Sequence, residues 1–172
     1  MPGPASHRLV VLGRILLWTA LGGWIGALLL CGVVVVRAAF EAVPDPGVAA
    51  DLIGRVLAPL QLAGIGLGVA LAALGGALGR GTLSIALPLA LAALCAANQF
   101  GIAPALAAID LTDPAAGADA GARFAHLHQL SVGLFVATAL GALLLGALHA
   151  AIELREEGLS GTGEARKKAK YS

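Results

Sequence analysis

Hydrophobic residues are arranged along this chain in four long runs that are separated by short polar segments. The runs occupy residues 15–36, 56–79, 83–109 and 122–152, and the first three contain no charged residue. A helix needs about 20 consecutive apolar residues to cross a bilayer core that is roughly 30 Å thick. The pattern therefore predicts an all-α fold, an integral membrane four-helix bundle with antiparallel, up-down-up-down connections.

The polar segments set the expected ends of these helices. They are an N-terminal lead (1–14), a connector (40–55), a tight turn (80–82), a loop (110–121) and a C-terminal tail (153–172). Asp51 is a predicted cap of the second helix, and Pro59 is expected within its first turns, where a missing N–H costs little. The tail from Ser160 onward is predicted to be disordered, because it has no apolar face to bury.

Composition supports a membrane protein. Hydrophobic residues make up 59% of the 172 residues and charged residues 12%, whereas soluble domains have about 45–50% and about 25%. The first run is longer than the apolar core of a secretory signal, which has about 7–15 residues. We therefore expect it to be an uncleaved helix within the lipid bilayer.

Basic residues predict the orientation of the bundle. An even number of spans places both termini on one side, together with the 80–82 turn. That side holds eight basic residues: Arg8, Arg14, Arg80, Arg155, Arg166, Lys167, Lys168 and Lys170. The other side holds three: Arg37, Arg55 and Arg123. By the positive-inside rule, both termini are predicted to be cytoplasmic, in a bacterial inner membrane.

Small residues recur at four-residue spacing in three of the runs. They are Gly22 and Gly26; Gly64, Gly68, Ala72 and Gly76; and Gly133, Ala137 and Gly141. In lipid there is little hydrophobic drive between helices, so close approach over small residues stabilises their contacts. These faces, those of the fourth run above all, are expected to pack within the bundle, or to mediate self-association or binding of other membrane subunits.

The hairpin formed by the third and fourth runs carries most of the polar residues that interrupt the apolar pattern. Counting about 20 residues from Arg80, and about 22 back from Glu153, reaches Phe100 and Ser131 near the outer interface. The rest of the hairpin is then expected to extend beyond the outer face. The same count places Asn98 at the depth of His128 and Ser131.

A candidate polar site follows from this depth argument. It consists of Asn98, His128 and Ser131, with Cys95 one turn deeper. Polar residues within spans are candidates for function, although these side chains could equally serve only to hold the two helices together. His126 lies roughly 200° around the helix from His128, so the two imidazoles do not converge on a metal, and no metal site is predicted.

The chain resembles a known family in the residues around this hairpin and in the first two runs. The residues that carry the resemblance are Trp24, Gly54, Arg55, Asn98, Pro104, Phe124, His128 and Ser131. This frame is similar to the domain of unknown function that bacterial proteins share with eukaryotic transmembrane protein 205. The resemblance implies a four-helix membrane protein with no agreed activity.

Three classes of function are compatible with the sequence. The first is a small non-enzymatic membrane protein that belongs to a larger complex or helps to assemble one. The second is a transporter or metal-handling protein that uses Asn98, His128 and Cys95. The third is a haem-binding electron carrier with ligands among His126, His128 and His149, but His149 lies roughly 30 Å along the helix from His128. No cofactor is predicted. Nucleic-acid binding is not predicted either, because the basic tail is short and has a single aromatic residue, Tyr171.

Overall fold

The computed structural model describes residues 4–109 and 117–170, with side chains described for residues 8–45, 47–109 and 119–156. The described residues are almost entirely helical. The elements are α1 (Pro4–Leu29), η1 (Leu30–Val35), α2 (Val36–Ala42), α3 (Pro46–Ala77), α4 (Leu83–Ala96), η2 (Ala97–Ile102), α5 (Ala103–Ala107) and α6 (Gly117–Lys170). The elements η1 and η2 are π-helical turns within otherwise continuous helices. The prediction of an all-α fold is confirmed.

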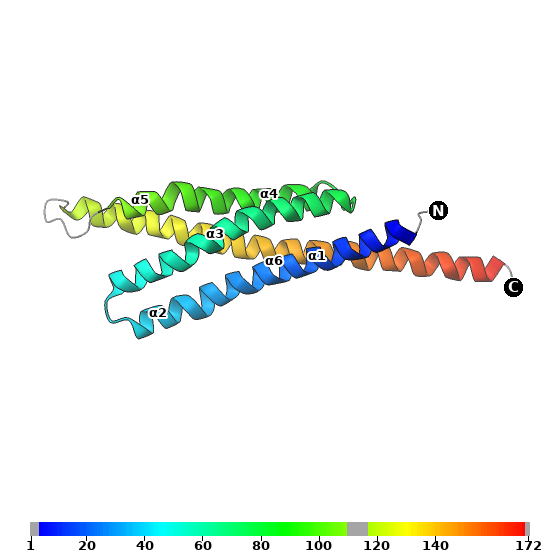
Figure 1. Ribbon diagram of the computed structural model, residues 1–172, viewed down its shortest axis with the longest axis horizontal. Helices are drawn as coiled ribbons and strands as arrows, with labels where there is room; N and C mark the ends of the chain where they lie inside the picture. Colours follow the sequence, from blue (N-terminus) through cyan, green and yellow to red (C-terminus); the bar gives the residue numbers. More distant parts are fainter. Residues whose placement is uncertain (1–3, 110–116, 171–172) are drawn as a thin grey trace.

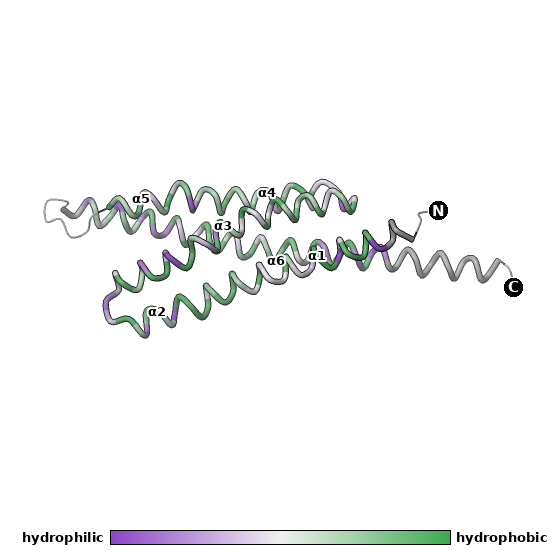
Figure 2. Tube along the Cα trace, viewed as in Figure 1, coloured by the Kyte–Doolittle hydropathy of each residue, from purple (hydrophilic) through white to green (hydrophobic). Residues whose placement is uncertain are grey.

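Four helical segments in the described part of the chain are long and apolar enough to cross a membrane. They are Arg8–Ala42, Gly47–Ala77, Leu83–Ala107 and Asp119–Glu156. Figure 1 shows them as two hairpins, α1–α3 and α4–α6, that lie together near the chain termini and diverge toward the opposite end. Figure 2 shows that hydrophobic residues dominate the middle of each helix, with hydrophilic residues gathered near its ends.

The helices extend further into the polar segments than the sequence analysis predicted. The expected connector 40–55 is reduced to residues 43–45, and Asp45, rather than Asp51, caps α3 by accepting hydrogen bonds from the backbone N–H groups of Gly47 and Val48 at 2.7 and 3.3 Å. Pro46 follows this cap at the start of the helix, where its fixed φ favours helix formation. Asp51 instead forms an ion pair with Arg55, one turn along α3.

The early start of α3 also changes the position of Pro59. This residue lies in the interior of the 32-residue helix rather than in its first turns. At the other end of the chain, α6 continues as a helix to Lys170, where the sequence predicts a disordered tail from Ser160. No proline interrupts this segment, and extending an existing helix costs less than nucleating a new one. Of the predicted 110–121 loop, residues 110–116 lie outside the described residues, and α6 begins at Gly117.

The turn between α3 and α4 depends on two glycines. Gly79 and Gly81 have φ values of 65° and 86°, a region that side chains with a Cβ rarely adopt. Arg80 donates its backbone N–H to the Gly75 carbonyl at 3.0 Å, and Gly79 donates to Gly76 at 3.0 Å. This pair of hydrogen bonds is a Schellman motif, which satisfies the last carbonyl groups of α3. The turn therefore holds Arg80 at the end of the bundle where both termini lie (Figure 1).

Close contact between α3 and α4 depends on small residues in α3. Contacting residues run in opposite order along the two helices: Gly64 lies against Cys95, Gly68 against Ala92, and Gly75 against Ser84. A methyl group at Gly68 would lie 2.6 Å from the carbonyl oxygen of Pro88. The predicted packing role is confirmed for Gly64 and Gly68. In contrast, Gly22, Gly26 and Gly133 have no neighbouring atom within 4 Å of an added Cβ.

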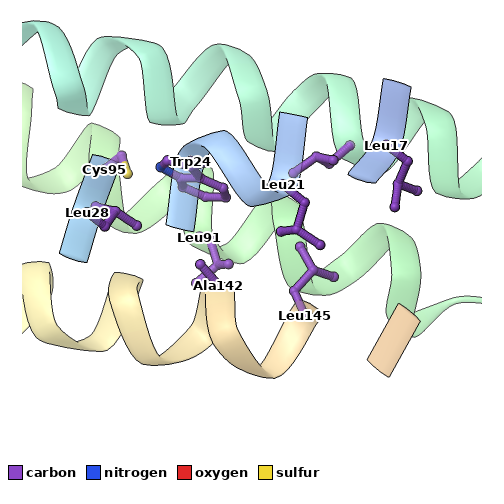
Figure 3. Packing of buried hydrophobic residues seen from close by; sticks show 9 residues of the cluster. Leu17, Leu21, Trp24, Leu28, Leu91, Cys95, Ala142 and Leu145 are labelled. Carbon is purple, nitrogen blue, oxygen red and sulfur yellow. The ribbon is translucent and has the colours of Figure 1, made fainter. Parts of the chain in front are cut away.

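The buried core runs along the inside of the bundle, where α1 meets α4 and α6 (Figure 3). It contains Leu17, Leu21, Trp24 and Leu28 of α1, Leu71 of α3, Leu91 and Cys95 of α4, and Ala142 and Leu145 of α6. Gly141 of α6 completes this contact, since a Cβ there would lie 2.4 Å from the Leu91 side chain. Among the small residues of the fourth run, Gly141 therefore packs internally and Gly133 does not.

Alanine at Gly68 tests the close contact between α3 and α4. We expect Gly68→Ala to lower the free energy of unfolding by about 1–3 kcal/mol, because the new methyl group forces the two backbones apart. Gly66→Ala is the matched control, since Gly66 lies in the same helix with nothing within 4 Å. Thermal unfolding in detergent micelles measures both. Equal stability of the two variants would contradict the packing described above.

Candidate functional site

Two members of the predicted polar site meet between the hairpin arms. The hydroxyl group of Ser131 in α6 donates a hydrogen bond to the Asn98 side-chain oxygen in η2, at 2.9 Å. Asn98 is buried, with 4% of its surface exposed. The depth argument placed Asn98 near both His128 and Ser131, and the structure brings it to Ser131, thirty-three residues away in the chain.

Asn98 lies in a π-helical turn. The backbone N–H of Ala103, next after η2, donates to the Asn98 carbonyl, five residues earlier. Pro104 follows immediately; it has no N–H, and its ring is incompatible with an α-helical carbonyl four residues before it. The wider π turn accommodates this proline, and such turns are frequent at functional sites. Pro104 therefore shapes the backbone that presents Asn98.

His128 does not join this pair. Its imidazole is exposed and stacks on the ring of Phe124, with centroids 6.1 Å apart and an interplanar angle of 6°. Phe124 and His128 are four residues apart and so lie on one helix face. In the described part of the chain, His128 takes part in no hydrogen bond with Asn98. The predicted three-residue cluster is thus reduced to Asn98 and Ser131.

Cys95 lies deeper in the bundle, as the sequence predicts. It is almost fully buried and lies within hydrogen-bonding reach of Thr138. A Cβ at Gly64 would lie 2.7 Å from the Cys95 sulfur and 3.3 Å from the indole nitrogen of Trp24. The absence of a side chain at Gly64 therefore lets Trp24 and Cys95 pack against α3 (Figure 3). A thiol in such surroundings acts as a small apolar residue.

The family-motif residues have different structural roles. Trp24 is buried in the core, with 1% of its surface exposed. Gly54 and Arg55 are exposed on α3, where Arg55 forms the ion pair with Asp51 at 3.0 Å. Pro104 is exposed at the start of α5, directly after the π turn.

A second polar cluster, which the sequence analysis missed, joins three segments near the chain termini. We call it the Arg80 cluster; its members are Arg14, Trp18, Arg80, His149, Glu153 and Glu156. The Arg80 guanidinium donates to Nδ1 of His149 at 3.0 Å and to the carboxylate of Glu153. The Trp18 indole donates to both oxygens of Glu153, at 3.0 and 2.9 Å. Arg14 forms an ion pair with Glu156.

The members of the Arg80 cluster differ in their burial. The Arg80 side chain is 1% exposed and that of Glu153 is 23% exposed, while His149 is completely buried. Removing one partner of a buried ion pair typically costs about 3–5 kcal/mol, because the other charge is left without compensation. In the sequence, Arg80 and Glu153 mark the ends of apolar runs, and Arg80 adds one to the count of basic residues, but nothing there pairs the two. Two signals could have revealed the cluster: His149 and Glu153 are four residues apart, as are Arg14 and Trp18.

Neither site has the ligands of a metal centre within the part of the chain that the structure describes. No three His, Cys, Asp or Glu side chains gather there closely enough to hold a metal ion. Both cysteines, Cys31 and Cys95, are buried and free. The chemistry available at the two sites is therefore hydrogen bonding by neutral side chains at Asn98 and ion pairing at the Arg80 cluster.

Comparisons with known protein families, with curated proteins and with solved structures found no match to this chain.

A double-mutant cycle tests the contact between Asn98 and Ser131. Hydrogen bonds between membrane helices average about 0.6 kcal/mol and reach about 1.7 kcal/mol, so we expect Asn98→Ala and Ser131→Ala each to lower stability modestly. The double variant should lose less than the sum, because each single change already breaks the contact. His128→Ala combined with Asn98→Ala is the control and should be additive. Non-additivity in the control pair, with additivity in the test pair, would refute this geometry.

Proposed function

We propose that this chain is a small, non-enzymatic membrane protein that belongs to a larger membrane complex or helps to assemble one. The observation that supports this proposal is that some glycines lie in contacts between helices of this chain, whereas others are exposed. Gly64, Gly68 and Gly75 in α3 are occupied by internal helix contacts. Gly22 and Gly26 in α1, and Gly133 in α6, are exposed and face open space.

Exposed glycines on a membrane helix offer a surface that another helix can approach closely. Around them, large apolar side chains of α1 and α6 are also exposed, among them Leu29, Val33, Leu140 and Leu144. A face of this kind suits the helix of a second membrane subunit or of a second copy of this chain. The polar residues between the helices support the non-enzymatic part of the proposal, since the Asn98–Ser131 pair and the Arg80 cluster both connect helices of this chain to each other.

The proposal includes the topology and the location. Four spans in an up-down-up-down order put both termini on the cytoplasmic side of a bacterial inner membrane, and the α5–α6 end of the second hairpin extends beyond the outer face. The excess of basic residues near the termini supports this orientation. Membership in the transmembrane protein 205 family is part of the same proposal, and it rests on the residues that carry the resemblance.

A transporter or metal-handling protein is the second candidate. The π turn at Asn98 favours it, because π turns inside α-helices are frequent at functional sites. Two observations count against a shared site: His128 is exposed and stacks on Phe124, and Asn98 is bonded to Ser131 instead. A haem-binding carrier has less support, because Nδ1 of His149 already accepts a hydrogen bond from Arg80.

Leucine substitutions at the exposed glycines test the proposed interface. We expect mild detergent to extract the protein within a complex. Gly26→Leu, alone or with Gly22→Leu, should release the protein from that complex, because the bulky side chains keep a partner helix from approaching α1 closely. Native gel electrophoresis of solubilised membranes measures the size of that complex. Ala63→Leu, at an exposed position of α3, is the control and should leave it intact. A complex of unchanged size in the Gly22 and Gly26 variants would exclude this face.

A single thiol tests the topology. In a variant in which Cys31 and Cys95 are replaced by alanine, we introduce cysteine at Ala116, which the proposal puts on the outer side. A membrane-impermeant maleimide should label this thiol in intact cells or spheroplasts, and a thiol at Ala165 only after the membrane is opened. The reverse pattern of labelling would invert the proposed orientation.

A further inference from the structure

His149 has an unusual hydrogen-bonding arrangement within the Arg80 cluster. Its side chain is 0% exposed, and its Nδ1 atom lies 3.0 Å from Nη1 of Arg80. A guanidinium group has donors and no acceptor, so Nδ1 of His149 must be the acceptor. The hydrogen bond therefore assigns the single imidazole proton to Nε2. Among the described residues, no acceptor lies within hydrogen-bonding distance of this buried Nε2.

A second proton on this imidazole has only one place to bind. It must add to Nδ1, the atom that accepts from Arg80, and a protonated Nδ1 would present a donor to a donor. Two cations would then lie 3.0 Å apart in poorly hydrated surroundings. One carboxylate, that of Glu153, contacts Arg80 and neutralises a single positive charge. Proton uptake by His149 and the Arg80 contact therefore exclude each other.

The other members of the Arg80 cluster hold α1 to α6. Arg14 of α1 pairs with Glu156 of α6, and Trp18 of α1 donates to Glu153. The Arg14–Glu156 pair does not involve the α3–α4 turn, whereas Glu153 binds both Trp18 and Arg80. The backbone N–H and carbonyl groups of Arg80 are hydrogen-bonded within the α3–α4 turn, to Gly75 and Ser84, and only its flexible side chain reaches α6. The guanidinium group can therefore rotate away from His149 while α1 and α6 stay joined.

We propose that His149 is a proton-binding site whose protonation breaks the hydrogen bond between Arg80 of the α3–α4 turn and α6. One proton from the aqueous phase next to Glu153 binds Nδ1, the Arg80–His149 hydrogen bond breaks, and the net charge of the cluster rises by one. No covalent bond other than the new N–H forms. Deprotonation restores the contact. This inference does not depend on the proposed role in a complex.

Fluorescence of Trp18 reports on the cluster, because its indole donates to Glu153. We use the full chain in lipid nanodiscs with Trp24→Phe, which leaves Trp18 as the single tryptophan and removes an indole N–H that has no acceptor among the residues that the structure describes. Between about pH 8 and pH 5, where imidazoles titrate, we expect one reversible shift in the emission of Trp18. His149→Asn should abolish it, because the Asn amide oxygen accepts from Arg80 in place of Nδ1 and does not titrate.

The matched control replaces the three other histidines, His7, His126 and His128, with asparagine and should keep the transition. Arg80→Gln gives an independent measurement if the His149→Asn variant fails to fold. The Gln amide still donates to Nδ1 but carries no charge, so the midpoint should move to higher pH by about one unit or more, equivalent to about tenfold in proton affinity. A transition that persists in His149→Asn, an unchanged midpoint in Arg80→Gln, or no transition in the parent protein would each overturn the proposal.

Discussion

The close approach of α3 and α4 is the contact on which the rest of this structure depends. In a bilayer, helices gain little from burying apolar surface against each other, because the lipid is equally apolar. Gly64, Gly68 and Gly75 instead let the two backbones come together, to the point that a Cβ at Gly75 would lie 2.5 Å from the carbonyl oxygen of Ser84. This contact positions Arg80 at one end of the α3–α4 pair and Asn98 at the other.

At one end, the α3–α4 contact positions Arg80. The tight turn that follows α3 leaves the guanidinium group buried against α6, where His149 and Glu153 bind it. A buried cation is costly unless it is paired, so its partners on α6 must lie at this depth. Trp18 and Arg14 add α1 to the same cluster. The ion pairs thereby join both hairpins at the end of the molecule that holds the two termini (Figure 1).

At the other end, the contact positions η2, and with it Asn98. The proline at position 104 requires the wider turn, and the wider turn presents the Asn98 amide to Ser131 in α6. The two polar sites thus differ in kind. The Asn98–Ser131 pair is neutral and connects the arms of one hairpin, whereas the Arg80 cluster is charged and connects both hairpins. A proton can change only the second, which is why we assign the proton-binding site to His149.

The sequence alone determined the helices, because long apolar runs in a chain of this composition have one stable form in lipid. The depth count from Arg80 and Glu153 brought Asn98 to the level of Ser131, but it also placed His128 in the pair, which the structure does not do. The helix ends could not be predicted from charge alone. The Arg37–Glu41 and Arg55–Asp51 pairs lie one helical turn apart and extend α2 and α3 past the uncharged runs. Only the tertiary structure decided which small residues face a neighbour, because a glycine in the sequence does not indicate whether its side of the helix contacts another helix. It also decided that His128 stacks on Phe124 and that His149 lies against Arg80, since the rotation of each helix about its axis depends on side-chain packing across all its neighbours.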